Sequence, residues 1–182
     1  GPAMKRRRLL SRLLGGCALS ALMLQLAQAN PTGGVVAQGQ ASISQAGGTL
    51  SVDQKTKIVI INWKDFNIGA GETTRFNQPG AGATAVNRIG GADPAKILGN
   101  LSANGRVILI DGNGILFGPN AKVNVGSLIA TTSDAADADL MAGKAKFDKA
   151  GNPNARIVNQ GKISAAAGGM VVVPGDRHQA VF

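Results

Sequence analysis

The chain has 182 residues and a formal net charge of +9, from 19 Lys and Arg against 10 Asp and Glu. Five of the basic residues lie within residues 5–12, which hold no acidic residue, so the remaining 14 basic and 10 acidic residues give the rest of the chain a charge of only +4. That balance gives no reason to expect a nucleic-acid partner. The only cysteine, Cys17, excludes an intramolecular disulfide, and the length suits a single domain.

The N-terminal residues have the pattern of an exported protein. Residues 1–3, Gly-Pro-Ala, precede Met4 and are interpreted as the remnant of an expression tag. Residues 5–12, which contain the five basic residues, are followed by an apolar run at positions 13–27. A membrane anchor is the alternative, but this run is short for a bilayer span, which needs about 20 apolar residues. We therefore expect residues 4–29 to be a signal peptide.

A cleavage site is predicted at the end of this segment. Ala27 and Ala29 flank Gln28 in the small-x-small pattern that precedes cleavage, so the mature chain is expected to start at Asn30. Such a chain crosses the inner membrane through the general export machinery, and Cys17 is removed with the signal.

Short apolar runs separated by turn-forming residues predict β-strands in the first half of the remaining chain. Residues 57–61 form a β-branched run that is typical of a buried strand. Residues 72–76 and 83–89 alternate apolar and polar side chains, which indicates half-exposed strands, with a turn at Asn-Gln-Pro-Gly between them. Because Asp93 and Pro94 are typical of the first positions of a helix, a short helix or a loop is expected from Pro94 to Leu101.

Residues 105–132 contain four apolar runs that are too short for helices. Between the first two runs lies a segment of turn-forming residues, Asp111, Gly112, Asn113 and Gly114. It predicts a tight turn, because Asn and Gly tolerate positive φ and Asp can hydrogen-bond its own backbone. Residues 134–149 have a helical or looped composition and are predicted to protrude from the strands. Short strands are expected again from residue 155 to 173.

A weak internal repeat indicates how these strands stack. Similar short sequences surround Ile43, Val123 and Ile163, whose spacings are multiples of a coil of about 20 residues, a length within the range of solenoid repeats. Stacked coils of this kind form a solenoid, and crossovers between parallel strands are almost always right-handed. The sequence therefore predicts an all-β fold, a right-handed parallel β-helix, with the protruding insertion at residues 134–149.

Several ordered motifs support this interpretation. They are Asn62-Trp63-Lys64-x-Phe66-Asn67-Ile68, Phe76-x-Gln78, Val86-Asn87-Arg88-Ile89, Ile97-Leu98-Gly99, Asn104-Gly105-x-Val107, Asn113-Gly114-Ile115 and Ile157-Val158-Asn159-x-Gly161-x-Ile163. In this order they resemble the N-terminal secretion domain of two-partner secretion exoproteins, the haemagglutination-activity domain of filamentous haemagglutinins and high-molecular-weight adhesins. The resemblance covers nearly all of residues 30–182. One departure is Asp-Gly-Asn-Gly at residues 111–114, where the family pattern has Asn-Pro-Asn-Gly.

The resemblance implies a parallel β-helix with an N-terminal cap, and it implies a partner. That partner is an outer-membrane β-barrel transporter with periplasmic docking domains, which passes the exoprotein to the medium or the cell surface. The domain then addresses a larger, adhesin-type exoprotein to the transporter and nucleates its folding outside the cell. We expect a monomer without a cofactor, metal or nucleic acid, and a chain that is shorter than the complete family domain.

The motif residues that are candidates for transporter recognition or for the cap are Asn62, Trp63, Phe66, Asn67, Ile68, Asn87 and Arg88. Two interpretations are compatible. These side chains form an exposed docking surface, or Trp63 and Phe66 close the end of the solenoid while Asn67 caps a turn.

Two other classes of protein are alternatives to the secretion domain. A β-helical enzyme acting on polysaccharides needs clustered carboxylates, whereas the ten acidic residues are scattered, so no catalytic residue is assigned. A domain that binds a ligand directly, as an adhesin does, is disfavoured by an aromatic content of 3%. Asp134, Asp137 and Asp139 are expected to be a solvated face rather than a calcium site, since no known loop spacing is present.

Overall fold

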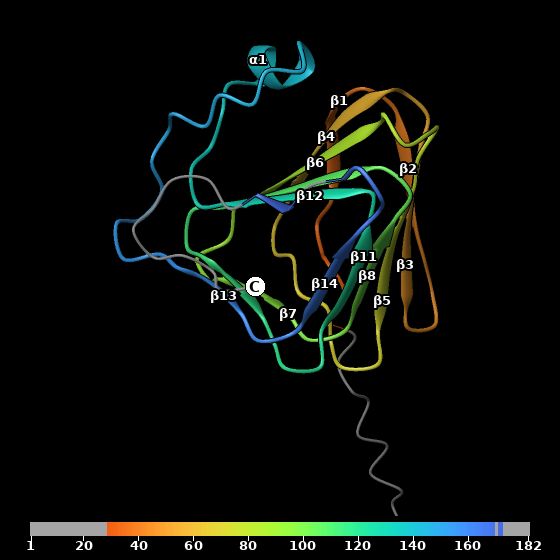
Figure 1. The fold of residues 1–182 in the computed structure, drawn as a ribbon, viewed down its shortest axis with the longest axis vertical. Helices are drawn as coiled ribbons and strands as arrows, with labels where there is room; N and C mark the ends of the chain where they lie inside the picture. Colours follow the sequence, from red (N-terminus) through yellow and green to blue (C-terminus); the bar gives the residue numbers. More distant parts are fainter. Residues whose placement is uncertain (1–28, 170, 173–182) are drawn as a thin grey trace, which may run out of the picture.

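A computed structural model describes residues 29–169 and 171–172, and their strands coil into a parallel solenoid (Figure 1). The signal-peptide segment up to residue 28, with Ala27 and Cys17, lies outside the described residues. Within the described ranges, three sheets enclose the core. The first sheet contains, in order, β1 (Val35–Gln38), β4 (Ile58–Trp63), β6 (Thr84–Ile89), β9 (Arg106–Asp111), β12 (Ser127–Thr131) and β15 (Val171–Val172).

The other two sheets complete each coil. The second contains β13 (Ile157–Asn159), β10 (Ile115–Phe117) and β7 (Ala95–Ile97). The third contains β14 (Lys162–Ala165), β11 (Lys122–Val125), β8 (Asn100–Ala103), β5 (Thr73–Asn77), β3 (Thr49–Gln54) and β2 (Ala41–Ala46). Apart from the antiparallel pairs β1–β4 and β2–β3, the strands of the described residues pair in parallel, which confirms the predicted parallel β-solenoid.

The coils are longer than the predicted period. Successive partners along the first sheet are Ile58, Thr84, Arg106 and Ser127, and the spacing between them shortens from the first coil to the third. Val123 pairs directly with Ile163, so the segment between them is one coil enlarged by the insertion, not two coils. Ile43 lies on β2, in an antiparallel hairpin with β3, and not on a parallel coil.

The expectation of a short helix or loop from Pro94 to Leu101 is wrong. This segment contains β7 and the start of β8. Ala95 and Ile97 alternate inward at 1% and 0% exposure and pair with β10 of the next coil. The pairing outweighs the helix-start preference of Asp93 and Pro94, both of which are exposed in the turn before β7.

An N-terminal cap covers the first coil. β1 pairs antiparallel with β4, and β2 pairs antiparallel with β3. Gly34, just before β1, lies directly on the indole, since a Cβ there would be 2.5 Å from Cζ3 of Trp63. Only a residue without a side chain allows this approach, so Gly34 permits the cap to close over Trp63.

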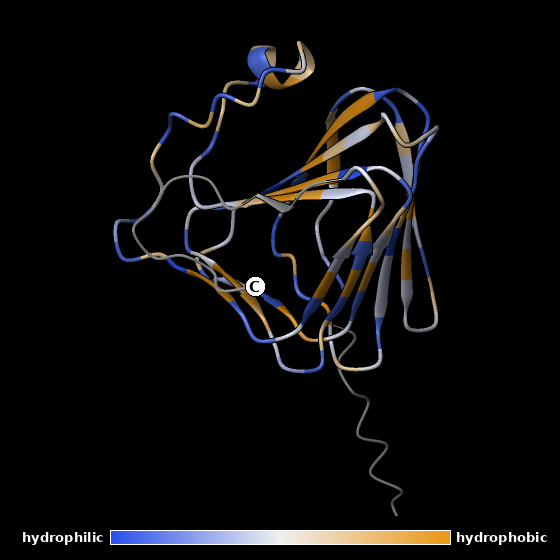
Figure 2. Ribbon diagram, viewed as in Figure 1, coloured by the Kyte–Doolittle hydropathy of each residue, from blue (hydrophilic) through white to orange (hydrophobic). Residues whose placement is uncertain are grey.

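In Figure 2 the hydrophobic residues (orange) lie mainly in the strands, where they alternate with more hydrophilic ones, and hydrophilic residues (blue) are frequent in the connecting loops. Inward side chains from all three sheets form one core cluster, in which Phe66, Phe76, Leu101 and Leu128 are fully buried. A second cluster lies on the outer face of the first sheet, where Ile60, Val86, Ile108, Ile110 and Ile129 meet the insertion residues Ala135 and Leu140.

The insertion leaves the strand stack as expected and contains α1 (Asp137–Met141). It does not stand free in solvent, because Leu140 is 4% exposed and packs against the outer face of the first sheet. Among the described residues, no helix has the length and apolar character to cross a membrane.

Two leucines near one corner test the assignment of the core. Leu101 is fully buried, whereas Leu98 is 37% exposed. Leu101→Ala is expected to lower the free energy of unfolding by about 2–5 kcal/mol, because it removes apolar contacts and leaves a cavity. Leu98→Ala, the matched control, is expected to cost less than about 1 kcal/mol. Urea unfolding of both variants measures the difference, and equal losses in the free energy of unfolding would contradict the inward orientation of Leu101 on β8.

Candidate functional site

Trp63 and Phe66 form an aromatic pair beneath the cap. Their ring centroids lie 5.6 Å apart with an interplanar angle of 82°, an edge-to-face arrangement. Trp63 is 3% exposed, and Phe66 and Ile68 are 0% exposed. These three side chains therefore fill the interior next to the cap and present no surface to a partner in the folded domain.

Asn87 is a buried polar side chain that fixes the indole. Its Oδ1 accepts a hydrogen bond of 2.9 Å from Nε1 of Trp63. Its Nδ2 donates to the carbonyl oxygens of Ala85 and Ile108, both at 3.3 Å. A buried amide is tolerated only when its hydrogen bonds are made, so Asn87 couples the indole of β4 to the backbones of β6 and β9.

Arg88, the neighbour of Asn87, points to the outer face and binds the insertion. Its Nε lies 2.9 Å from Asp134 Oδ2, and its Nη2 lies 2.8 Å from Asp137 Oδ1 and donates to the carbonyl oxygen of Ala135 at 3.2 Å. Desolvation by burial acts to lower the pKa of Arg88, but the contacts with Asp137 and Asp134 outweigh it and raise the pKa above its ordinary value.

Asp134, Asp137 and Asp139 were expected to form a solvated acidic face. The side chains of Asp134 and Asp137 are 33% and 42% exposed, and both also pair with one guanidinium, which holds the start of the insertion against the first sheet. Within the described residues, no group of three or more His, Cys, Asp or Glu side chains is placed to hold a metal ion.

Asn62 and Asn67 lie nearer the surface. Asn62 is exposed, and its Oδ1 accepts a long hydrogen bond of 3.4 Å from Nη1 of Arg88. Asn67 is half-buried, and its Oδ1 accepts a hydrogen bond of 2.9 Å from the backbone N–H of Lys96 in the next coil. Asn67 thus caps backbone at a corner, and Asn62 is the most exposed of the seven motif residues.

The predicted tight turn at residues 111–114 is tied to the coils on both sides. Asn113 Nδ2 donates to the carbonyl oxygen of Gly91 at 2.7 Å in the preceding coil. The carbonyl oxygen of Gly112 accepts from the N–H of Asn152 at 2.8 Å in the following segment. Gly114 has φ +107°, and a Cβ there would lie 2.5 Å from the carbonyl oxygen of Arg156.

Asp111 is a fully buried carboxylate within this turn. Its Oδ1 accepts from the N–H of Asn113 at 2.9 Å, and its Oδ2 accepts from the N–H of Ala95 at 3.0 Å. Burial raises the pKa of Asp111 to about 6, although these two backbone donors act in the opposite direction. The carboxylate joins β9, the turn and β7 at one corner.

A second corner, which the sequence interpretation did not single out as a site, is held by amides. Gln78 Oε1 accepts from the N–H of Gly105 at 2.8 Å, and its Nε2 donates to Gln54 Oε1 and to the carbonyl oxygen of Arg106, both at 3.1 Å. Asn104 and Gln78 exchange two further hydrogen bonds of 2.8 Å through the backbone of Gln78. The presence of Gln78 and Asn104 in the ordered motifs was the available signal.

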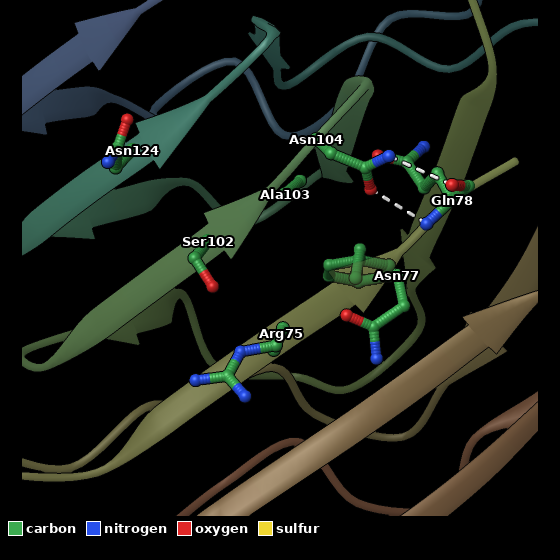
Figure 3. Close-up of a pocket in the computed structure, with 8 residues that line it drawn as sticks. Arg75, Asn77, Gln78, Ser102, Ala103, Asn104 and Asn124 are labelled. Carbon is green, nitrogen blue, oxygen red and sulfur yellow. Dashed lines mark hydrogen bonds between the residues drawn. The ribbon is translucent and has the colours of Figure 1, made fainter. Parts of the chain in front are cut away.

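The outer face of the third sheet carries an open polar depression of about 380 Å³ (Figure 3). Arg75, Ser102 and Asn124 stand in one row across β5, β8 and β11, because each is the parallel partner of the next. Asn77, on the same strand as Arg75, donates to Asp53 Oδ1 at 2.8 Å. The side chains of Arg75, Asn77, Ser102 and Asn124 thus offer hydrogen-bonding groups in the depression.

The predicted start of the mature chain is docked in the fold. Asn30 is 1% exposed; its Nδ2 donates to the carbonyl oxygen of Gly48 at 2.9 Å, and its Oδ1 accepts from Thr74 Oγ1 at 3.3 Å. The N–H of Ala29 donates to Glu72 Oε1 at 3.0 Å.

This architecture is similar to that of known secretion domains. A family model described as the TPS secretion domain matches residues 27–181. The crystal structure of the HMW1 secretion domain from Haemophilus influenzae superimposes with a TM-score of 0.71 at 31% sequence identity, over 79% of this chain and 39% of that one.

Two curated relatives are heme/hemopexin-binding proteins of Haemophilus influenzae. One is 40% identical over 104 residues, which is 57% of this chain and 12% of the relative. The other is 39% identical over 85 residues, which is 47% of this chain and 9% of the relative. The chain therefore spans about a tenth of the length of these relatives.

The turn at Gly114 gives a testable cost. Gly114→Ala is expected to lower the free energy of unfolding by more than about 1 kcal/mol, because alanine disfavours positive φ and its Cβ would meet Arg156. Gly82→Ala is the control, since Gly82 has no positive φ and no heavy atom within 4 Å of a built Cβ. It is expected to change stability by less than about 0.5 kcal/mol. Denaturant titration of the pair decides, and equal effects would exclude a special role of the turn.

Asp111 predicts a pH dependence of stability. Its pKa is raised on folding, so the stabilisation that the protonated group contributes is fully present below about pH 4 and is lost as the pH rises through about 6. The difference in free energy of unfolding between the unaltered protein and Asp111→Asn should change by on the order of 2–3 kcal/mol across this interval. A flat difference for Asp111 would contradict the effect of burial.

Proposed function

Because this chain belongs to the family of TPS secretion domains, we propose that it is recognised by a cognate outer-membrane transporter while it is still unfolded. The family consists of secretion domains of exoproteins and not of enzymes, and its exoproteins are secreted across the outer membrane. On this proposal the domain brings a larger, adhesin-type exoprotein to the transporter from the periplasm, after export and signal removal at the inner membrane. It then folds outside the cell and starts the solenoid there.

The burial of the motif side chains supports recognition before folding. Trp63, Phe66 and Ile68 are inside the folded domain, so a transporter can contact them only in an extended chain. β3 and β5 alternate buried and more exposed residues, as in Leu50-Ser-Val52 and Thr74-Arg-Phe76. An extended segment with this alternation is suited to strand addition, in which backbone hydrogen bonds supply affinity and pockets accept every second side chain.

The cap supports the role in nucleation. It lies at the N-terminal end, where β1 pairs antiparallel with β4 and β2 pairs antiparallel with β3. The strands of later coils pair parallel with those of the coil before them. In a solenoid each coil contributes its own stability plus an interface with its neighbour, so a formed first coil favours the second. Folding from the cap onward would draw the chain outward without a nucleotide-driven motor.

Secretion of residues 4–182 tests the transporter part of the proposal. In cells that carry the cognate transporter, the protein should appear in the medium with an N-terminus at Asn30; without the transporter, it should remain in the periplasm. Retention in both strains would contradict the proposed recognition by this segment.

A binding experiment tests whether the unfolded chain is the recognised state. Trp63 is the only tryptophan, so its fluorescence reports closure of the cap during refolding from urea. Binding to the immobilised periplasmic domains of the transporter should be strong immediately after dilution and decline at the rate of the fluorescence change. Equal binding by the fully folded domain would favour a folded surface such as the depression around Arg75 and Ser102, and would overturn strand addition.

A further inference from the structure

Glu72 carries an unexplained buried oxygen. Its Oε2 is the one buried side-chain oxygen or nitrogen among the described residues that lacks a hydrogen-bond partner. Its Oε1 accepts a hydrogen bond of 3.0 Å from the N–H of Ala29. No Lys or Arg side chain in the described part of the chain forms an ion pair with it. An unpaired buried carboxylate oxygen is costly, and a cation with several N–H donors would remove the cost.

The surroundings of Glu72 hold the predicted N-terminus of the mature chain. Asn30 is anchored by its own side chain to the carbonyl oxygen of Gly48 and to Thr74 Oγ1. A Cβ on Gly48 would lie 3.8 Å from Cγ of Glu72, so the same loop contacts both residues. The backbone nitrogen of Asn30 is one residue from that of Ala29, a step of at most about 3.8 Å. With the 3.0 Å bond from Ala29, this step places it at most about 7 Å from Glu72 Oε1.

The backbone around Glu72 is fixed. Its N–H donates to the carbonyl oxygen of Gly69 at 3.0 Å, and its carbonyl oxygen accepts from the N–H of Asn100 at 2.9 Å. Gly69 leaves room for the side chain, since a Cβ there would lie 2.5 Å from Glu72 Oε1 and 3.5 Å from Cβ of Ala29. The carboxylate, Gly69 and Ala29 are thus packed together at the entry of the chain into the fold.

We propose that Glu72 is the binding site for the α-ammonium group of Asn30 that signal-peptide cleavage creates. This rests on cleavage after Ala29, not on recognition by a transporter. In the cleavage, water adds across the Ala29–Asn30 amide bond: Ala29 leaves with the signal as a carboxylate, and the nitrogen of Asn30 gains protons and becomes a cation. Loss of Ala29 removes the donor to Oε1, and the new ammonium, with three N–H donors, replaces it and satisfies Oε2 as well.

Signal cleavage and docking of the N-terminal segment then follow a fixed order. Asn30 is 1% exposed in the fold, so the scissile bond is covered once this segment has docked. Cleavage therefore precedes docking, and the first coil of the processed chain closes on a charge that the precursor lacks. The fold thereby distinguishes processed chains from precursors.

The test uses the natural processed protein. Residues 4–182 are expressed in cells without the outer-membrane transporter, the processed species is collected from the periplasm, and its N-terminus is sequenced. The folded protein is then labelled with an amine-acetylating reagent at pH 7, and labelling is followed residue by residue by mass spectrometry. A start at a residue other than Asn30 overturns the proposal and leaves transporter recognition untouched.

The α-amine of Asn30 is expected to react about tenfold more slowly in the folded protein than in urea, because a nearby carboxylate raises an amine pKa by about one unit or more. Glu72→Gln should remove most of this protection while the lysine rates stay unchanged. Asp65→Asn is the matched control, because its carboxylate accepts a hydrogen bond of 2.6 Å from Thr32 Oγ1 in the same N-terminal segment. Equal α-amine rates in the unaltered protein and E72Q overturn the ion pair.

A second measurement decides if E72Q does not fold. The labelling rate of the unaltered folded protein is recorded as a function of pH, and its midpoint gives the pKa of the Asn30 α-amine. A midpoint about one unit above the ordinary range of about 7.7–8.0 supports the ion pair. A midpoint within that range overturns it.

Discussion

Each coil of this domain depends on its neighbours for its backbone hydrogen bonds. In a parallel solenoid the N–H and C=O groups of a strand have no partner within their own coil, and burial without partners would be prohibitive. The register from Ile58 through Thr84 to Arg106 shows how directly one coil dictates the next. The first coil has no preceding coil, and the antiparallel strands β1 and β2 supply the missing partners there. The cap is therefore the condition on which every later coil rests.

The corners impose a second requirement, because sheets meet there and the ladder is interrupted. Gln78 and Asp111 solve it with buried side chains that bind backbone groups of adjacent coils. Asn87 makes the same kind of bond between coils from within β6. Each lies in or next to one of the ordered sequence motifs. Residues that look like a recognition signature in the sequence thus, in the folded domain, hold one coil on another. The same sequence motif can therefore arise from a residue needed for folding or from one needed for recognition by a partner.

The strands and the turn at Asn113 were predictable because their causes are local: alternation of apolar residues, β-branched runs, and residues that tolerate positive φ. The segment after Pro94 was misassigned since local helix-start preferences opposed a pairing with β10, which the sequence does not display. The clamp of Arg88 on Asp134 and the bond from Trp63 to Asn87 both join residues on different coils or elements, far apart in the sequence. No spacing rule reveals such contacts. The seven motif residues were found as a group, but which of them are buried followed only from the coil register.

If the transporter reads the alternating side chains of β3 and β5 in an extended chain, binding and folding compete for the same groups. Leu50, Val52 and Phe76 cannot occupy a pocket of the transporter and the core of the solenoid together. Folding then withdraws the recognised side chains, so each coil that forms outside lowers the chance that the chain slips back. The direction of transport would arise from mutually exclusive burial of one set of side chains. Its free energy would be the ordinary stability of the coils, gained on one side of the membrane only.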